Sequence, residues 1–284
     1  MIRRPPRSTQ SRSSAASDVY KRQEIKDVIR NLISSEMDKV MNKVTITDPF
    51  LPEDHKFKKP LYAALVPDEI FKGSHFERRF VTPFGNLWEK LAKELAIQKH
   101  GSCEKGYRVK GMIGAETLRR IQEVLNELEH NKNTKPSWYK ELNYIQNGGG
   151  KLVSIEVECD IFIDSKIDGK RYAFELKAPL PNSDQTKVSK EKIFKLLSME
   201  ARETDYAFFA LPYNPYGEKI DYAHTFPMRW FDMHSDPSIL IGDEFWDLIG
   251  GKGSLDIVIE VCEELGSKYK KRINKEYLDI DPLI

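Results

Sequence analysis

The chain has 284 residues, of which 40% are hydrophobic and 31% are charged, as is typical of a soluble globular protein with one large domain or two modest ones. Its apolar runs are all too short to span a membrane, which excludes a membrane-embedded function. The three cysteines lie far apart without CxxC spacing and the six histidines form no HxxxH pair, so neither a disulfide framework nor a zinc site is indicated.

The first 23 residues differ in composition from the rest of the chain. Residues 1–23 are rich in Ser and Arg, and without an apolar stretch they do not form a signal peptide. They resemble a translated sequencing-adaptor read that begins metagenome-derived reading frames, so we expect a non-native, disordered segment; the alternative is a basic arm that grips nucleic acid. Removing their six Lys or Arg and one Asp takes the chain from 45 basic and 44 acidic residues to 39 and 43, a net charge of −4. Any nucleic-acid binding must then come from a local basic surface.

After this segment, the sequence predicts two helices separated by irregular structure. Glu24 to Val44 has apolar residues at i, i+3 and i+4 spacing, which predicts an amphipathic helix. Residues 49–75 carry four prolines and predict irregular structure with room for one short strand or helix. Asn86 can cap a second helix over residues 87–99. In that helix Glu89 is either a solvated acid with an ion-pair partner one turn on, or part of a site.

The next elements lead to a loop rich in glycine. Tyr107 to Ile113 predicts a strand, and Ala115 to His130 predicts a helix with a regular apolar stripe. Asn131 to Gly150 is polar and ends in three consecutive glycines, so we expect a loop.

The stretch from Ile155 to Pro179 predicts a β-hairpin. Two runs rich in β-branched and aromatic residues flank a polar turn that contains Asp168 and Gly169. Because side chains alternate along a strand, antiparallel pairing can gather Asp160, Glu175 and Lys177 at one place. Such a cluster is costly in a half-buried sheet unless a cation or a function accompanies it.

The remaining elements complete an α/β pattern. Lys187 to Arg202 predicts a helix, and Tyr206 to Leu211 predicts a buried central strand. Residues 244–250 and Ser254 to Lys271 predict two further helices. We therefore expect a mixed sheet with helices against it, in a single domain over residues 24–284.

The order Asp160, Glu175, any residue, Lys177 has the form of the motif of PD-(D/E)xK nucleases. Carboxylates on adjacent strands offer the oxygen ligands that Mg²⁺ prefers, and the metal can acidify its water and neutralise charge on a phosphate. A nearby lysine can orient the attacking water, or take its proton if its pKa is lowered. The motif alone is weak, because an acid two residues before a lysine also occurs at Glu24 and Asp54, among other places, and a surface hairpin with a weak ion pair explains it equally well.

Five blocks of sequence carry a resemblance that goes beyond this motif. In chain order they are residues 84–96, Cys159–Ile163, Phe174–Lys177 followed by Pro181 and Asn182, Tyr213–Tyr216 and residues 244–251. Together they resemble the TdeIII family of type II restriction endonucleases, over nearly everything from residue 25 onward.

This resemblance implies both a fold and a set of site residues. The expected fold is α/β, with a restriction-endonuclease-like PD-(D/E)xK core, a central mixed β-sheet flanked by helices, and additional N- and C-terminal helices. Asp160 falls on the metal-binding aspartate, Glu175 on the second acid, Lys177 on the catalytic lysine, and Glu89 on a helix glutamate that supports the metal. Some members of the family have Asp where this chain has Glu175, but both acids can bind a metal. The implied reaction is sequence-specific hydrolysis of double-stranded DNA with Mg²⁺, for which Mn²⁺ can substitute.

The same reading gives partners and a location. Lys187, Lys190, Lys192 and Asn182 are candidates for contacts with the DNA backbone, although an ordinary solvated helix face explains each lysine as well. By family analogy we expect a cytoplasmic homodimer, with a DNA methyltransferase in the same system but not as a physical partner.

Two alternatives to restriction stay open at this point. One is a repair or structure-selective nuclease on the same fold, and the other is a DNA-binding module without catalysis. The recognition sequence and the position of the cut depend on groove contacts that the sequence does not specify.

Overall fold

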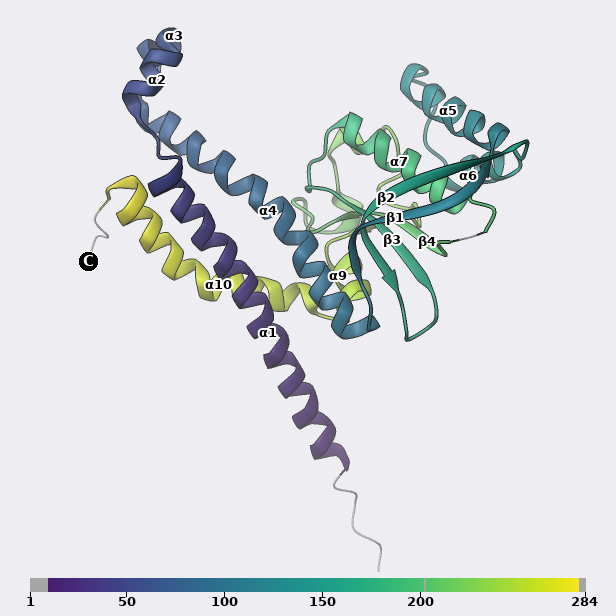
Figure 1. Ribbon diagram of the computed structural model, residues 1–284, viewed down its shortest axis with the longest axis horizontal. Coiled ribbons are helices and arrows are strands. Elements are labelled where there is room, and N and C mark those ends of the chain that lie inside the picture. The colour runs from purple at the N-terminus through teal and green to yellow at the C-terminus, as the bar shows by residue number, and fades with distance from the viewer. Residues whose placement is uncertain (1–9, 202, 281–284) are drawn as a thin grey trace, which may run out of the picture. The chain divides into compact units, whose positions relative to one another are not determined.

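The computed structural model describes residues 10–201 and 203–280, and the chain divides into two compact units (Figure 1). The first unit extends to Leu87 and resumes at Asp256, and the second spans Trp88–Leu255. A single domain over residues 24–284 stays a prediction, because compactness does not test whether the two units fold as one.

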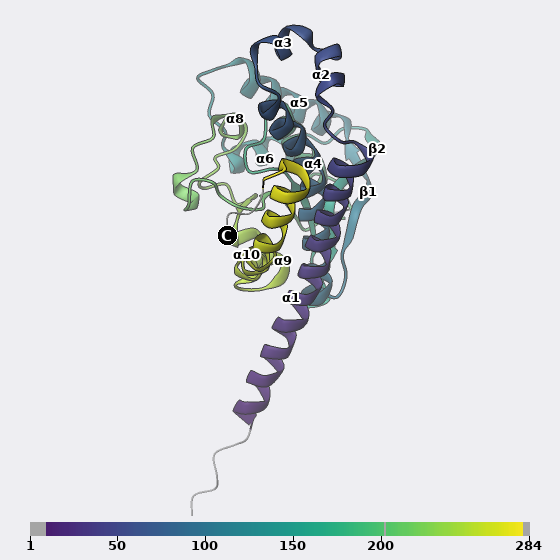
Figure 2. The same cartoon turned by 90° about the vertical axis from the view of Figure 1, so that its left-hand side faces the viewer.

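The first unit is helical. It contains α1 (Gln10–Asn42), η1 (Lys43–Thr47), α2 (Pro52–Lys58), α3 (Pro60–Leu65), the start of α4 (Asp68–His100), most of α10 (Ser254–Ile273) and η3 (Asn274–Leu278). Helices α1 and α10 run side by side (Figures 1 and 2), with Arg30 paired to Glu264 at 2.7 Å and the Tyr269 hydroxyl donating to the Ser34 carbonyl at 3.0 Å. The helix predicted over residues 24–44 is thus confirmed.

Helix α1 is longer than expected. Residues 10–23 are helical where disorder was predicted, and residues 1–9 lie outside the described residues. Extending an existing helix costs much less free energy than nucleating one. The Ser-rich residues 10–23 can therefore extend, towards the N-terminus, the helix whose apolar stripe begins at residue 25.

Two of the four prolines of residues 49–75 start helices, so this segment is more helical than predicted. Pro52 and Pro60 occupy the first turns of α2 and α3, where a missing backbone N–H costs nothing. Helix α4 already begins at Asp68 and contains Pro83, so the prediction that Asn86 caps a new helix is wrong.

The second unit is built on a five-stranded mixed sheet. In spatial order the strands are β1 (Glu104–Gly114), β2 (Leu152–Asp164), β3 (Arg171–Leu176), β4 (Tyr206–Leu211) and β5 (Ile239–Ile241). The pairs β1–β2 and β2–β3 are antiparallel, and β3–β4 and β4–β5 are parallel. Strand β4 lies between two neighbours, as predicted from its continuous apolar run.

Helices cover both faces of this sheet. Ala173 and Phe209 lie in the core shared with α5 (Ala115–His130), α6 (Trp138–Gln146) and α7 (Ser183–Leu197), whereas Phe174 packs edge-on against Phe245 of α9 (Asp243–Gly250), with ring centroids 5.9 Å apart. The predicted mixed sheet flanked by helices is confirmed.

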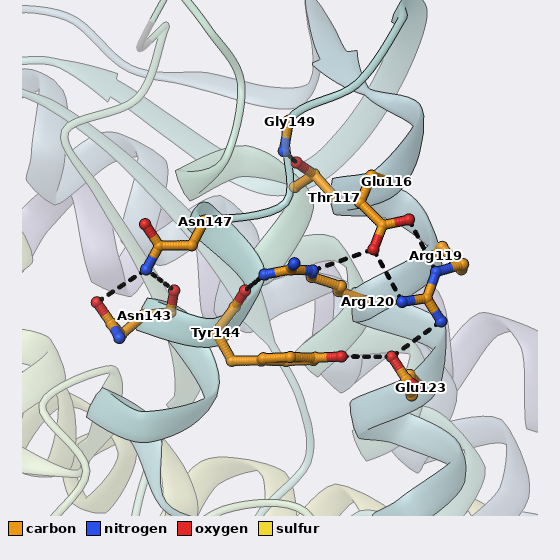
Figure 3. A network of polar contacts seen from close by, with 9 residues as sticks. All are labelled: Glu116, Thr117, Arg119, Arg120, Glu123, Asn143, Tyr144, Asn147 and Gly149. Carbon is orange, nitrogen blue, oxygen red and sulfur yellow. Dashed lines mark hydrogen bonds and ion pairs between the residues drawn. The ribbon is translucent and has the colours of Figure 1, made fainter.

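The polar segment of residues 131–150 contains helix α6, which was predicted to be a loop. Its polar residues contact α5 (Figure 3): Tyr144 donates to Glu123 at 2.5 Å, and Arg120 donates to the Tyr144 carbonyl at 2.8 Å. The Gly149 N–H donates to the Thr117 hydroxyl at 2.9 Å, which fixes the chain just before β2 begins. The apolar stripe of α6 consists of only Trp138, Leu142 and Ile145, which pack into the core, and three residues among polar neighbours are a weak periodic signal.

Three short elements were not predicted: β5, η2 (Lys219–Asp221) and α8 (Thr225–Met228). Each has four residues or fewer, too short for a periodic pattern. Across the described part of the chain, no helix combines the length and apolarity needed to cross a membrane.

Candidate active site

The hairpin of β2 and β3 brings Asp160, Glu175 and Lys177 together. Ile161 pairs with Phe174 in the ladder, so Asp160 and Glu175 occupy the next position along it. The Lys177 ammonium lies 2.7 Å from Oδ2 of Asp160 and 3.3 Å from Oε2 of Glu175. The backbone N–H of Leu176 also donates to Asp160 Oδ2, at 2.8 Å. The gathering of charge expected from strand alternation is present in the structure.

Glu175 is a buried carboxylate whose two oxygens have different surroundings. The residue is 1% exposed, and its Oε1 accepts a hydrogen bond from Lys192 of α7 at 2.9 Å. Its Oε2 is also buried, and its nearest cation is the Lys177 ammonium at 3.3 Å, which Lys177 shares with the closer Asp160. Burial raises the pKa of Glu175, as does the negative charge of Asp160, and the two lysines only partly oppose this rise.

Lys177 is held as a cation by the two acids. Burial by itself lowers the pKa of Lys177, but the charges of Glu175 and Asp160 and their hydrogen bonds outweigh it, so the pKa is raised. In this arrangement Lys177 is an ammonium at neutral pH. It can donate hydrogen bonds and neutralise negative charge.

The two carboxylates are suitable ligands for a hard divalent cation that takes few ligands from the protein. In the residues with described positions, no group of three or more His, Cys, Asp or Glu comes together to hold a metal ion. Two carboxylates are nevertheless a normal set for Mg²⁺, which keeps several waters and takes one or two carboxylates together with substrate phosphate. The buried Oε2 of Glu175, whose contact with the shared Lys177 ammonium is the longer one at 3.3 Å, is an acceptor that such an ion would satisfy.

Glu89 lies one strand away from this group. Its carboxylate, on α4, is 2.8 Å from the ammonium of Lys105 on β1, rather than paired within its own helix. Lys105 pairs in the ladder with Ile161, the neighbour of Asp160. The described ion pair of Glu89 is with Lys105, and Glu89 does not join Asp160 and Glu175 in a cluster of three acids among the described residues.

The residues predicted to contact the DNA backbone have four different environments. Asn182 caps α7, where its side chain accepts from the Gln185 N–H at 2.8 Å, and Lys187 is paired with Glu129 at 2.6 Å. Lys192 binds Glu175, as described above. The spacing of Asn182 and Gln185 is a signature of such a cap, whereas the partners of Lys187 and Lys192 come from other elements and could not be found from local sequence.

The prediction for Lys190 is wrong. Its side chain is fully buried, 2.6 Å from the carboxylate of Glu141 and hydrogen-bonded to the Trp230 carbonyl, so no phosphate can reach it. Burial lowers the pKa of Lys190. On α7 it lies one turn before the buried Ile193 and Phe194, which places it in the inward-facing stripe of the helix.

Comparisons with known proteins agree on one class. The model of the family described as "Type II restriction endonuclease, HinfI" matches residues 25–266. The type II restriction enzyme HgiEI of Herpetosiphon aurantiacus is 25% identical over 269 residues, which is 90% of this chain and 97% of that enzyme. HgiCII of the same organism is 25% identical over 226 residues, covering 78% and 82% of the two chains.

Proposed function

Because the chain belongs to the HinfI family of type II restriction endonucleases, and is therefore a site-specific deoxyribonuclease, we propose that it cleaves double-stranded DNA with Mg²⁺ held by Asp160 and Glu175. The observation that carries this proposal is the pair of carboxylates, one buried and one partly exposed, with the Lys177 ammonium between them. The resemblance to the TdeIII family indicated the right class of enzyme; the matching family model is that of HinfI, and a TdeIII grouping stays a prediction.

Each residue of the pair would serve the metal in a distinct way. Asp160 is 23% exposed in its side chain and would offer its carboxylate to the ion from the accessible side, whereas Glu175 would offer the buried Oε2. When bound, Mg²⁺ acidifies a coordinated water and neutralises charge on the phosphate that is attacked. Mn²⁺, which also prefers oxygen ligands, is expected to substitute.

Lys177 would orient the attacking water and stabilise negative charge. Its raised pKa supports a role as a hydrogen-bond donor instead of a general base. Held at 2.7 Å from Asp160, the ammonium is fixed beside a metal-binding oxygen without a loop or lid. Positioning of this kind acts mainly through preorganised charge.

Glu89 is the least constrained of the proposed site residues. Its proposed role, to support the metal through a water, rests on the family resemblance, and its carboxylate is paired with Lys105 of the neighbouring strand β1. If Glu89 supports the metal, its ion pair with Lys105 would have to break or be shared with the metal-bound water.

DNA contacts and assembly complete the proposal. Lys187 and Asn182 lie near the start of α7 and stay candidates for contacts with the DNA backbone, while Lys192, the third candidate, is paired with Glu175. A homodimer would suit a two-fold symmetric target, and the cognate methyltransferase would protect the same target without binding this protein.

The experiment that tests the site is plasmid cleavage in Mg²⁺ by Asp160→Asn and Lys177→Ala. Both variants should cleave about 100-fold or more slowly than the parent, because each loses preorganised charge at the reacting phosphate. Glu156→Gln is the matched control, since Glu156 lies on the same strand but is paired with Arg108 at 3.1 Å and should be dispensable. Near-parental cleavage by either site variant would refute the assignment. Sequencing of the cut ends would separate a fixed target from the structure-selective alternative.

A further inference from the structure

Lys192 makes the closest ion pair of Glu175. Its ammonium lies 2.9 Å from Oε1, and the contact joins helix α7 to strand β3. The Lys192 side chain is 28% exposed, whereas the Glu175 side chain is 1% exposed. An ammonium that is already engaged by a buried carboxylate has less to offer to a DNA phosphate, which is the role that the sequence suggested for it.

The two carboxylate oxygens of Glu175 contact different lysines. Oε1 is bound by Lys192, and Oε2 lies 3.3 Å from Lys177, whose ammonium also contacts Asp160 at 2.7 Å. Oε2 is therefore the oxygen on the side of Asp160. A partial turn of the carboxylate would move Oε2 away from Asp160, and the hydrogen bond from Lys192 to Oε1 opposes that turn.

Helix α7 gives Lys192 a fixed base. The helix begins with a capping box in which Asn182 and Gln185 each accept from the other's backbone N–H. The two residues after Lys192, Ile193 and Phe194, are fully buried against the sheet. Two residues earlier, the buried pair of Lys190 and Glu141 ties the same helix to α6. The backbone under Lys192 is thus constrained on both sides.

We propose that Lys192 is a positioning residue: it holds Oε1 of Glu175 so that Oε2 faces the divalent metal and Asp160. This inference rests on the proposed function, since it takes Glu175 as a metal ligand. Groups that orient a metal ligand from behind commonly contribute 10- to 100-fold to metal affinity. The role differs from a phosphate contact in one measurable respect, because it does not require DNA.

The test compares Lys192→Met and Lys192→Arg with a matched control. Lys195 lies one turn further along α7, has the same side-chain exposure of 28%, and is paired with Glu191 at 2.7 Å without contacting Glu175. Lys195→Met therefore removes a similar charge from the same helix. Mn²⁺ binding to each full-length protein is measured by titration calorimetry without DNA, and binding to a DNA fragment is measured by fluorescence anisotropy in EDTA.

We expect the variants to differ in Mn²⁺ affinity but not in DNA affinity. Lys192→Met should bind Mn²⁺ about 10-fold or more weakly, Lys192→Arg should recover most of that affinity, and Lys195→Met should equal the parent. In EDTA all three should bind DNA within about 2-fold of the parent, because a phosphate contact is not lost. Unchanged Mn²⁺ affinity in Lys192→Met overturns the proposal, and so does an equal loss in Lys195→Met.

Two further arms keep the outcome decisive. If Lys192→Met does not fold, as judged by circular dichroism, Lys192→Ala and Lys192→Arg are compared, and equal Mn²⁺ affinities for these two refute the positioning role, because only Arg can donate to Oε1. Asp160→Asn separates this inference from the proposed function. If Asp160→Asn binds Mn²⁺ as the parent does, the metal site itself is misplaced; if it loses Mn²⁺ while Lys192→Met retains it, only the role of Lys192 fails.

Discussion

The buried pair of Lys190 and Glu141 gives a prediction whose size follows from burial. The Lys190 side chain is 0% exposed and that of Glu141 is 10% exposed, so solvent screens their interaction little. Lys190→Met leaves the Glu141 carboxylate without its cation and the Trp230 carbonyl without its donor. Breaking one side of such a pair costs about 3–5 kcal/mol, and we expect a loss of about 4 kcal/mol in the free energy of unfolding.

The assay is urea unfolding followed by tryptophan fluorescence. All four tryptophans lie within Trp88–Leu255, so the signal reports on the unit that contains Lys190. The double variant Lys190→Met/Glu141→Gln should recover about 2 kcal/mol, because it no longer buries an unpaired charge. Lys187→Met is the control: its pair with Glu129 is partly exposed and should contribute less than about 1 kcal/mol. A double variant no more stable than Lys190→Met alone would refute the reasoning.

Three further predictions concern the same unit. Burial raises the pKa of Asp236 to about 6 from 3.8, so between these pH values the folded state keeps a proton that the unfolded state has released. The free energy of unfolding should therefore fall by up to about 3 kcal/mol as the pH rises through this window. Asp236→Asn should remove that pH dependence, as measured by urea unfolding at several pH values. Gly114→Ala would place a Cβ 2.0 Å from the Gly149 carbonyl oxygen, and should lower the free energy of unfolding by about 3 kcal/mol; a parental urea midpoint would contradict this. Burial raises the pKa of Cys103 and Cys159 to about 12, so iodoacetamide at pH 8 should label them only after unfolding, as read by mass spectrometry, and rapid labelling of the native protein would exclude this environment.

Elements with a strong period were predictable from the sequence, and those defined by context were not. Helix α5 and strand β4 have the predicted bounds, since their apolar residues follow the periods of a helix and of a buried strand. Helix α4 was shortened in the prediction because Pro83 and Asn86 are read locally as a break and a cap. Inside a long helix with an apolar face, packing outweighs both signals.

The same distinction holds for the candidate site: residues related by a local pattern were predictable, and residues whose partners come from other elements were not. Asp160, Glu175 and Lys177 could be placed together because a hairpin and side-chain alternation fix their relation. The partners of Lys190 and Lys192 come from α6 and β3, and no local pattern encodes them. From the sequence, every lysine on a helix is predicted to be solvent-exposed, whether it faces water, a buried acid or an acid proposed to bind the metal.

The two kinds of strand pairing imply an order in which the site assembles. Asp160 and Glu175 sit in an antiparallel hairpin, which closes over a short turn, whereas β3 and β4 are parallel and are joined through helix α7. Pairing across such a crossover has a larger loop-closure cost and is slow. The two acids are therefore expected to meet early in folding, and Lys192 joins them only when the crossover docks. During that interval the hairpin carries two neighbouring carboxylates with one cation between them, and a divalent ion present while the chain folds would act on the rate of folding as well as on the finished enzyme.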